Sequence, residues 1–464
     1  MIVMKFGGTS NRDAVAIKNV VGIITTHLPL RPVVVISAVA KATNELEQTA
    51  RTAAVGKYKE ALVILDGLID RHRDIARALF SHDDQVRPLE ELLHACRDDI
   101  ARLVQGVAIL RELTPRTLDA FCSFGERMSS ALVAARLQAN GIDAVWVDAK
   151  EFMITDDNFG CAYPLMDRVS ERLATVIQPL VEAGKTPVTQ GFIGVTESGM
   201  PTTMGRESSD FSASIIGAGM NAELVQIWTD VDGILSADPT VVRDIRQVSE
   251  MSFDEAFELA YFGAKVLHPN TMLPLFEKNI PVEVRNSSRS NGAGTRVDAA
   301  TVHDSAARVK SIAFQKGVTL VTVRPYKRLD QYLFWDGLFS VLSRHGIRSR
   351  NSTTSEFCIA FTVAEKVDLT VLKHELEEFG SVEVLAGKGS VTIVGEGVRG
   401  AAGLTSRVFG ALVQIPVEMI SFGASHLNLT LIVAEPRVEE AVRLLHRELF
   451  GGVDESATVH VLDD

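Results

Sequence analysis

The sequence predicts an α/β protein: a three-layer sandwich around a mainly parallel central sheet, followed by two small βαββαβ domains. Two observations predict this class. Over the first 295 residues, short apolar runs at 33–36, 144–147 and 224–228 alternate with segments of helical periodicity. Strands that are apolar on both faces and are joined by helices form parallel sheets that helices cover on both sides.

The second observation is an internal repeat in the last third of the chain. A shift of 70 residues aligns two segments, and no gap is needed between residues 338 and 368. Each copy is predicted as helix, strand, turn, strand and helix with one more strand before it, and we assign both copies to the βαββαβ class, in units of roughly 70 residues. The pairs that carry the alignment are Phe339 and Phe409, Leu342 and Leu412, Ser355 and Ser425, and Val363 and Val433.

These patterns predict the domain boundaries. Residues 1–295 form the first domain, and its charge-rich stretch 46–113 is a helical insertion because its apolar positions have helical spacing. Residues 286–294, rich in Ser, Asn and Gly, form a linker. The two repeats occupy residues 308–385 and 386–464, and we expect that strands can be exchanged between them.

Composition restricts the classes of partner. The net charge of −12 argues against nucleic acid, whose binding depends on clustered Lys and Arg. The four cysteines have no paired spacing, so we expect thiols in a reducing compartment and no protein metal site. We find no signal peptide and no uninterrupted apolar stretch of about 18 residues, and therefore expect a cytoplasmic protein without membrane contact.

The stretch Lys5-Phe6-Gly7-Gly8 joins a predicted strand to a predicted helix. A glycine pair at the start of a helix leaves backbone N–H groups uncovered, and the neighbouring ammonium adds a positive charge. This combination can hold a phosphate, although the motif alone also fits a simple tight turn. The helix that follows has its apolar positions at Ala14, Ile17, Val20 and Val21.

A second polar segment, 202–210, precedes a helix predicted to begin near Phe211. Ser209 or Asp210 could cap that helix. Capping does not explain Arg206, because a cation is unfavourable at the positive end of a helix dipole unless an anion binds there. An arginine at this place suits a two-point contact with a substrate carboxylate.

Taken in order, the motifs resemble those of the aspartate kinases (aspartokinases), which have the amino-acid-kinase fold and carry paired ACT regulatory domains. The resemblance covers essentially the whole chain. The matching stretches are KFGGTS at 5–10, SAVAKATN at 37–44, GERMS at 125–129, PVTQGF at 187–192, TTMGRESSD at 202–210, WTDVDG at 228–233 and FGAKVLHP at 262–269.

The resemblance implies transfer of the γ-phosphoryl group of ATP, carried with Mg²⁺, to the β-carboxylate of L-aspartate. The product is 4-phospho-L-aspartate, the first intermediate toward lysine, threonine and methionine. A carboxylate nucleophile with a pKa near 4 is already ionised at neutral pH, so no general base is required. The reaction then depends on positioning and on charge neutralisation.

The resemblance also implies the roles of individual residues. Lys5 and Lys265 would neutralise the transferred phosphoryl group, and Asp210 would orient the groups around it. Glu126 would bind the ammonium of aspartate and Arg206 its α-carboxylate, with Thr43 and Ser209 beside them. The implied nucleotide contacts are Lys5, Phe6, Gly7, Gly8, Thr229, Asp230, Lys265 and Val266.

The chain departs from the family pattern in the catalytic half. Glu207 and Ser208 replace two glycines after the substrate arginine, so side chains occupy a place where backbone approaches the ligand. Leu235 and Thr240 replace a tyrosine and an arginine that commonly contact the nucleotide. We therefore expect altered contacts with substrate and nucleotide.

The regulatory half departs further. Arg350 stands where lysine-inhibited relatives offer an acidic side chain, and Arg344 and Arg348 are close in sequence. With Thr354 and Ser355, Arg350 marks the implied effector site. Cations there would repel lysine, so we predict that lysine is a poor effector, which leaves threonine or no effector open. Small open sheets pair through their edges, so we expect a homodimer through residues beyond about 305.

Two alternatives remain. The chain could be an inactive amino-acid sensor with the same fold, but a sensor has no reason to keep both Lys5 and Lys265. It could also phosphorylate a glutamate derivative, but the ACT pair and the segment FGERMSS at 124–130 favour aspartate.

Overall fold

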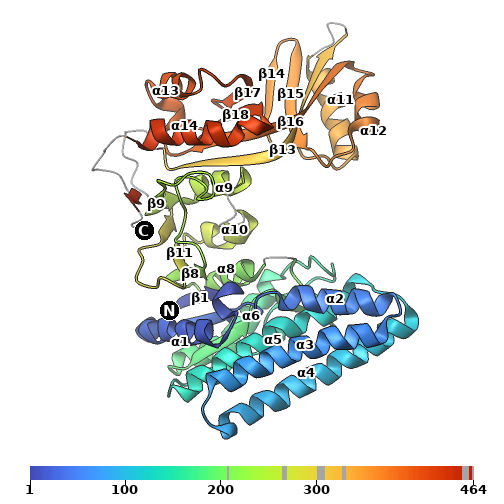
Figure 1. The fold of residues 1–464 in the computed structure, drawn as a ribbon, viewed down its shortest axis with the longest axis vertical. Helices are drawn as coiled ribbons and strands as arrows, with labels where there is room; N and C mark the ends of the chain where they lie inside the picture. The colour runs from blue at the N-terminus through green and yellow to red at the C-terminus, as the bar shows by residue number, and fades with distance from the viewer. Residues whose placement is uncertain (206–207, 264–268, 300–308, 327–330, 452–458, 462–464) are drawn as a thin grey trace. The chain divides into compact units, whose positions relative to one another are not determined.

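The structure is a computed structural model that describes residues 1–205, 208–263, 269–299, 309–326, 331–451 and 459–461. The chain divides into two compact units. Unit 1 contains Met1–Gly233 and Asn270–Ala299, and unit 2 contains Ile234–Pro269 and Ala300–Asp464. Figure 1 labels their helices and strands. Within the described residues, no helix is long and apolar enough to cross a membrane.

Unit 1 is built on a mainly parallel sheet with the strand order β12-β11-β8-β1-β2-β5-β3. Neighbouring strands are parallel except β12, which is antiparallel to β11. The apolar runs predicted as strands belong to this sheet, so the predicted fold class is confirmed. The strands are β1 (Ile2–Phe6), β2 (Pro32–Ile36), β3 (Ala144–Trp146), β5 (Thr186–Gln190), β8 (Leu224–Thr229), β11 (Val282–Asn286) and β12 (Thr295–Asp298).

Helices cover both faces of this sheet. Alternate side chains of a strand point to opposite faces, and Ile2, Met4 and Phe6 of β1 share a buried core with helices α1 (Ala14–His27) and α5 (Pro115–Ala139). Helix α8 (Ser209–Gly219) packs on the other face, so closely that a Cβ atom on Gly217 would lie 2.6 Å from Val225. Helices α6 (Met166–Val176) and α7 (Gln178–Glu182) precede β5.

Helices α2 (Ala42–Ala54), α3 (Tyr58–Leu79) and α4 (Asp83–Leu110) extend from unit 1, as the blue helices in Figure 1 show. They account for the stretch 46–113 that the sequence predicts to be helical, except that the last helix ends at Leu110. Their apolar stripes join the same core as α1 and α5. Arg71 and Glu45 form a two-point ion pair between α3 and α2, with N–O distances of 2.8 and 2.7 Å.

Unit 1 also contains a small three-stranded sheet, whose strands come between β3 and β8 in the sequence. It consists of β4 (Ile154–Thr155), β6 (Ile193–Thr196) and β7 (Pro201–Thr203). Strand β6 is parallel to β4 and antiparallel to β7. Strand β7 leads directly into the segment that precedes α8.

Unit 2 contains an antiparallel sheet with the order β14-β15-β13-β16-β18-β17. Its strands are β13 (Ser311–Pro325), β14 (Ser352–Ser355), β15 (Cys358–Ala364), β16 (Gly380–Val394), β17 (Val417–Phe422) and β18 (Asn428–Ala434). The helices of the two repeats are α11 (Gln331–Arg344), α12 (Leu369–Leu376), α13 (Leu404–Ala411) and α14 (Val438–Phe450).

The internal repeat corresponds to two copies that share this sheet. Leu342 and Leu412, aligned by the repeat, are buried in separate cores, one in each copy. The long strands β13 and β16 pair along their length, so 318–325 lies beside 380–388 and 311–315 beside 390–394. The second half of β13 and the first half of β16 therefore belong to the first copy. The first half of β13 and the second half of β16 belong to the second copy.

The segment 234–269 lies within the predicted first domain but belongs to unit 2. It contains β9 (Arg246–Val248), β10 (Glu250–Ser252) and α9 (Phe253–Tyr261), and β19 (Val459–Val461) pairs with β9. Ala237 and Val242 join the core of the second repeat. The segment ends where α10 (Pro269–Glu277) begins. The predicted boundaries at residues 295, 308 and 386 stay predictions about sequence domains.

Candidate active site

The carboxyl ends of β1, β2, β5 and β8 meet at one edge of the unit 1 sheet, which is where ligands bind in open parallel sheets. Gly7 follows β1, Ser37 follows β2, Gly191 follows β5, and Thr229 ends β8. Several residues that the sequence predicts for the site are therefore brought together from distant parts of the chain.

Lys5 lies in the middle of the site. It is 8% exposed, and its Nζ lies 2.5 Å from Oδ1 of Asp210. Lys5 and Val3 are two residues apart on β1, so their side chains point to the same face of the sheet. Val3 pairs with Val225, which marks this face as the one that α8 covers. Asp210 is in the first turn of α8, where a carboxylate is favourable because the N-terminus carries partial positive charge. The lysine is therefore held at a helix N-terminus, a place suited to anions.

Glu126 is the buried carboxylate of the site. It comes from the middle of α5, is 3% exposed, and its Oε1 accepts a 2.7 Å hydrogen bond from the Ser209 hydroxyl. Its Oε2 has no hydrogen-bond partner among the described residues. Burial raises the pKa of Glu126 to about 7, although the Ser209 hydroxyl, the charge of Lys5 and the backbone N–H groups of Gly191 and Ala38 act against this rise.

The Ser209 hydroxyl does not cap α8. The N-cap residue is Ser208, and no side-chain hydrogen bond caps the helix there. Ser209 instead directs its hydroxyl to Glu126, 83 residues earlier in the chain. This contact needs Gly191, because a Cβ atom at that position would lie 2.6 Å from the Cβ of Ser209.

Thr43 lies beside the turn of α5 that carries Glu126. A Cβ atom on Gly125 would lie 3.7 Å from Oγ1 of Thr43 and 3.3 Å from Cβ of Ala38. Thr43 is the second residue of α2, whose N-cap residue Lys41 has a left-handed backbone with φ of 69°. The loop after β2 thus places the threonine hydroxyl next to Gly125, the residue that precedes Glu126.

The predicted nucleotide residues at the ends of β1 and β8 are adjacent. The Gly7 N–H donates a 3.0 Å hydrogen bond to the carbonyl of Trp228. The Thr229 hydroxyl donates to Asp230 at 3.2 Å. Phe6 is fully buried and its ring stacks on Trp228, so its side chain belongs to the core and only its backbone borders the site.

Arg206, Glu207, Lys265 and Val266 lie outside the described residues. Their predicted roles stay predictions. Two of the other departures lie in unit 2, where the Thr240 hydroxyl donates a 2.6 Å hydrogen bond to Asp238 and the Leu235 carbonyl accepts one from Ser311.

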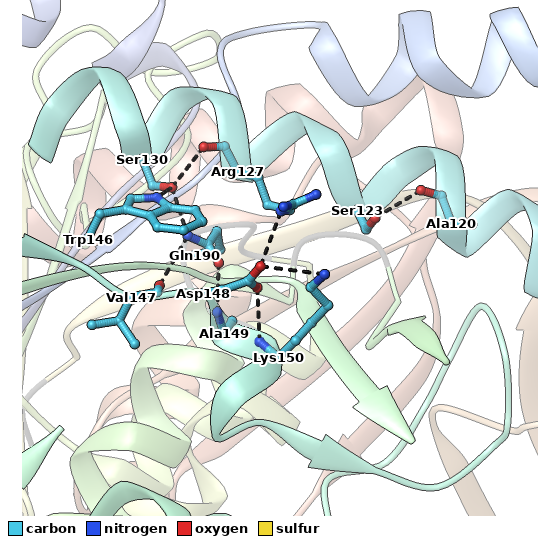
Figure 2. A network of polar contacts seen from close by, with 10 residues as sticks. All are labelled: Ala120, Ser123, Arg127, Ser130, Trp146, Val147, Asp148, Ala149, Lys150 and Gln190. Atoms are coloured by element: carbon cyan, nitrogen blue, oxygen red, sulfur yellow. Dashed lines mark hydrogen bonds and ion pairs between the residues drawn. The ribbon is translucent and has the colours of Figure 1, made fainter. Parts of the chain in front are cut away.

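A polar network fixes α5 against β3 and β5, as Figure 2 shows. The Gln190 side chain accepts from the Ala149 N–H at 2.7 Å and donates to the Ser130 hydroxyl at 2.8 Å. The indole of Trp146 donates to the same hydroxyl. Arg127, next to Glu126, lies 3.3 Å from a carboxylate oxygen of Asp148. The network holds the helix that presents Glu126.

Sequence reasoning missed Gly191 as a site residue and Asp119 as a second buried carboxylate on the helix that presents Glu126. Gly191 was available as a glycine directly after a predicted strand. Asp119 lies seven residues before Glu126, on the same face of α5, and is 2% exposed. An acidic residue at that spacing on an apolar helix face was the only sequence signal for it.

The predicted effector residues lie in unit 2. Arg350 donates a hydrogen bond to the Gln315 side chain. Arg344 lies 3.0 Å from Glu375, which also contacts His345 at 2.8 Å. Thr354 and Ser355 lie on β14, whose residues are all exposed.

Comparison with known proteins shows which family the chain belongs to. Residues 1–286 match the Amino acid kinase family and residues 391–449 match the ACT domain. Lysine-sensitive aspartokinase 3 of Escherichia coli is 34% identical over 97% of this chain and 99% of its own. Aspartokinase 1, chloroplastic, of Arabidopsis thaliana is 34% identical over 97% of this chain and 80% of its own.

A solved structure agrees. The crystal structure of E. coli aspartokinase III in complex with aspartate and ADP has 33% sequence identity and a TM-score of 0.82, and the match covers 97% of this chain and 100% of that one. The fold and sequence thus define an amino-acid kinase. More specifically, the chain belongs to the aspartokinases that carry C-terminal ACT domains.

Proposed function

We propose that this aspartokinase transfers the γ-phosphoryl group of ATP to the β-carboxylate of L-aspartate at the edge of the unit 1 sheet. The observation that carries the proposal is the position of Glu126. It is a buried carboxylate with an unpartnered Oε2, and Lys5 and Asp210 lie at the same edge. A buried charge of this kind suits a ligand cation, and the ammonium of aspartate supplies one.

In the proposed reaction, an oxygen of the substrate β-carboxylate forms a bond to the γ-phosphorus, and the bond from that phosphorus to the β,γ-bridging oxygen breaks to release ADP. No proton needs to be removed, because the β-carboxylate is ionised at neutral pH. Lys5 neutralises the oxygens of the transferred group, and Asp210 holds the ammonium of Lys5. The Gly7 N–H is used within the sheet, so we assign the backbone contact with phosphate to Gly8.

The glycines also provide room for the nucleotide. A Cβ atom on Gly8 would lie 3.0 Å from the carbonyl oxygen of Ala38, and one on Gly7 would lie 3.7 Å from Nζ of Lys5. Side chains at these positions would crowd the space beside the lysine. We propose that Thr229 and Asp230 at the end of β8 line the neighbouring part of the nucleotide site.

Mg²⁺ fits this site as an ion carried by the nucleotide. Among the described residues, no group of three or more His, Cys, Asp or Glu side chains could hold a metal ion. Mg²⁺ commonly takes most of its oxygens from substrate phosphates and water, with one or two carboxylates. Asp210 and Asp230 are the carboxylates we assign to it, and the ion would neutralise charge on the phosphates.

The decisive test measures acyl phosphate directly. We expect ATP-dependent hydroxamate formation with L-aspartate and none with L-glutamate or N-acetyl-L-glutamate at equal concentration. Hydroxamate from glutamate derivatives only would contradict aspartate as the acceptor. Binding of aspartate without any hydroxamate would instead support the inactive sensor.

Three further statements belong to the proposal. We propose a homodimer through residues beyond about 305, where the edge strand β14 is exposed along its length. We also propose an amino-acid effector site at Arg350, Thr354 and Ser355. A cytoplasmic location remains a prediction from composition.

A further inference from the structure

We propose that Asn11 is a positioning residue for the phosphate chain of the nucleotide. The inference rests on the proposed function, which assigns a phosphate contact to the N–H of Gly8. Asn11 touches neither the phosphates nor the acceptor in that reaction. Its side chain acts on the peptide unit between Gly7 and Gly8, and this unit carries the N–H that meets the phosphate.

Two buried hydrogen bonds join Asn11 to the turn that follows β1. Asn11 is fully buried, and its Nδ2 donates to the carbonyl of Gly7 at 2.9 Å and to the carbonyl of Phe6 at 3.4 Å. The opposite orientation of the amide would bring its oxygen against both carbonyl oxygens, so these contacts require the donor side of the amide. One side chain therefore holds both peptide units at the beginning of the turn.

The peptide unit between Gly7 and Gly8 is easily turned over unless a neighbour holds it. A residue without a Cβ atom adopts a wide range of backbone conformations, and this unit is flanked by two of them. In a trans peptide unit the C=O and the N–H point in opposite directions. When Asn11 holds the carbonyl of Gly7, the N–H of Gly8 therefore points away from Asn11. A unit turned the other way would present a carbonyl oxygen to the phosphate and repel it.

The N–H groups of Gly8 and Thr9 are left for a ligand. Among the described residues, neither of these groups donates to an acceptor of the chain. The N–H of Asn11 donates to the carbonyl of Gly8 at 3.3 Å, which turns the N–H of Thr9 away from Asn11 by the same geometry. A Cβ atom on Gly7 would lie 3.7 Å from Nζ of Lys5, so an ammonium lies close to these two donors. Adjacent free N–H groups beside a positive charge suit an anion.

The two carbonyls that Asn11 contacts have other donors. The carbonyl of Gly7 also accepts from the N–H of Ser10 at 3.1 Å, and that of Phe6 accepts from the N–H of Ser37 at 3.0 Å. Oδ1 of Asn11 has no hydrogen-bond partner among the described residues, and a buried oxygen without a partner is costly. The amide is therefore not needed to satisfy the turn, and orientation of the turn is the role that its contacts leave for it.

The test measures nucleotide binding by the full-length protein separately from turnover. The probe is the unreactive β,γ-imido analogue of ATP with Mg²⁺, titrated by calorimetry. Asn11→Leu keeps nearly the same shape and removes both donors, so we expect it to raise the Kd of the analogue about tenfold. The KM for aspartate should stay unchanged, and the unfolding temperature should not fall, because the unpaired oxygen is removed with the donors. Asn11→Ala, a smaller side chain if leucine does not fit, should weaken binding in the same direction.

Gln138→Met is the matched control. The Gln138 side chain is also a carboxamide of unit 1 that donates to a backbone carbonyl, that of Ala144 in β3 at 2.8 Å. Its loss removes the same kind of hydrogen bond without touching the turn after β1. We expect the Kd of the analogue to stay unchanged in this variant.

A mutant cycle tests whether Asn11 acts through the N–H of Gly8. Gly8 has a φ of −63°, which proline adopts, so Gly8→Pro removes this N–H. Gly8→Ala keeps the N–H and brings the same Cβ atom to 3.0 Å from the carbonyl oxygen of Ala38. We expect Asn11→Leu to weaken analogue binding about tenfold in the alanine background but less than about threefold in the proline background.

The outcomes separate this inference from the proposed function. Unchanged analogue binding in both Asn11 variants would overturn the inference, as would an equal loss in Gln138→Met. Equal effects of Asn11→Leu in the two Gly8 backgrounds would show that Asn11 does not act through this N–H, which also overturns it. If the unaltered protein binds no analogue at all, the proposed function itself is rejected.

Discussion

Among the described residues, one buried lysine–carboxylate ion pair in unit 1 and one in unit 2 differ in what surrounds them. In unit 1, Lys5 lies 2.5 Å from Asp210, and in unit 2, Lys310 lies 2.8 Å from Glu255. Both lysines are less than a tenth exposed. The Asp210 side chain is 20% exposed, whereas that of Glu255 is 1% exposed.

The pair in unit 2 is complete, in the sense that the chain supplies hydrogen-bond donors to both oxygens of the carboxylate. Oε2 of Glu255 accepts from Lys310 and from the N–H of Ser252 at 2.8 Å, and Oε1 accepts from the N–H of Glu396 at 2.8 Å. Glu255 also closes a capping box at the start of α9. The carboxylate therefore joins the start of α9 to Lys310, which directly precedes β13, and to Glu396, which follows β16.

The pair in unit 1 is open, in the sense that acceptor oxygens around it are left without a hydrogen-bond partner from the described part of the chain. It lies at a sheet edge next to Glu126, whose Oε2 has no partner among the described residues. A buried polar group without a partner is costly, so its persistence indicates a ligand or a strained site. The comparison teaches that burial alone does not separate a catalytic ion pair from a structural one. The number of acceptor positions that the chain itself fills does separate them.

The largest expected effect tests the open pair. Lys5→Ala should lower kcat by at least about 1,000-fold, because charge neutralisation carries most of phosphoryl transfer. The unfolding temperature should change little, since Asp210 is partly hydrated at a helix N-terminus. Steady-state kinetics and thermal unfolding measure the two effects, and Lys185→Ala on the surface of unit 1 is the control. Retained turnover would remove Lys5 from the chemistry.

The next effect concerns Glu126. Glu126→Gln should raise the KM for aspartate about 100-fold by removing a charge-assisted contact with the substrate ammonium. In the unaltered protein the KM should fall as pH rises from 6 to 8, because the ionised form gains population around a pKa of about 7. The variant should lose this pH dependence, and Glu112→Gln at an exposed position should keep it.

Stability gives Glu126 a second, independent readout. Its pKa is raised from 4.5 to about 7 in the folded protein, so the folded state holds a proton that the unfolded state loses. Between these values the free energy of unfolding falls as pH rises. Glu126→Gln should therefore be more stable than the unaltered protein at pH 8 and nearly equal to it at pH 5. Equal unfolding temperatures at pH 8 would contradict the raised pKa.

The sequence predicted whatever depended on local periodicity. The apolar positions Ala14, Ile17, Val20 and Val21 are buried in α1 as predicted, and the apolar runs are strands. Lys5 and Glu126 were implied by local motifs. The contact from Ser209 to Glu126 could not be predicted, because it joins residues 83 positions apart and competes with an ordinary capping role.

The same limit applies to Asp119 and to the segment 234–269. Asp119 meets Thr203 at a separation of 84 residues, and no spacing rule links them. Glu255 has the local pattern of a capping box, but Lys310 and Glu396 are 55 and 141 residues away. Local patterns therefore locate elements, whereas the partners of buried charges follow from the tertiary fold.

A smaller effect on turnover is expected when the complete pair is broken. Lys310→Met should leave Glu255 buried without a cation and destabilise the protein by about 3 kcal/mol. The kcat of the folded protein should stay within about threefold of the unaltered value, because the loss concerns a structural pair. Urea unfolding measures the first effect, and Lys316→Met, a change at an exposed lysine on β13, is the control. A catalytic loss of the size expected for Lys5→Ala would erase the distinction between the two pairs.

The smallest expected effect concerns lysine, and it extends the comparison to the effector region of unit 2. A lysine ligand needs an anionic partner for its side-chain ammonium, as a buried or half-buried carboxylate would provide. Here Arg350 occupies the predicted position and donates to Gln315, and Glu375 of the same repeat already contacts Arg344 and His345. His345 holds the pKa of Glu375 below its usual range, with Arg344 adding to the effect, so this carboxylate is neutralised by its own chain.

We therefore expect kinase activity to stay constant across a lysine titration to millimolar concentration, in contrast to what the name of the lysine-sensitive E. coli relative says of that enzyme. Half-inhibition below 1 mM would show that the arginines do not exclude lysine, and Arg350→Glu should in that case strengthen the inhibition.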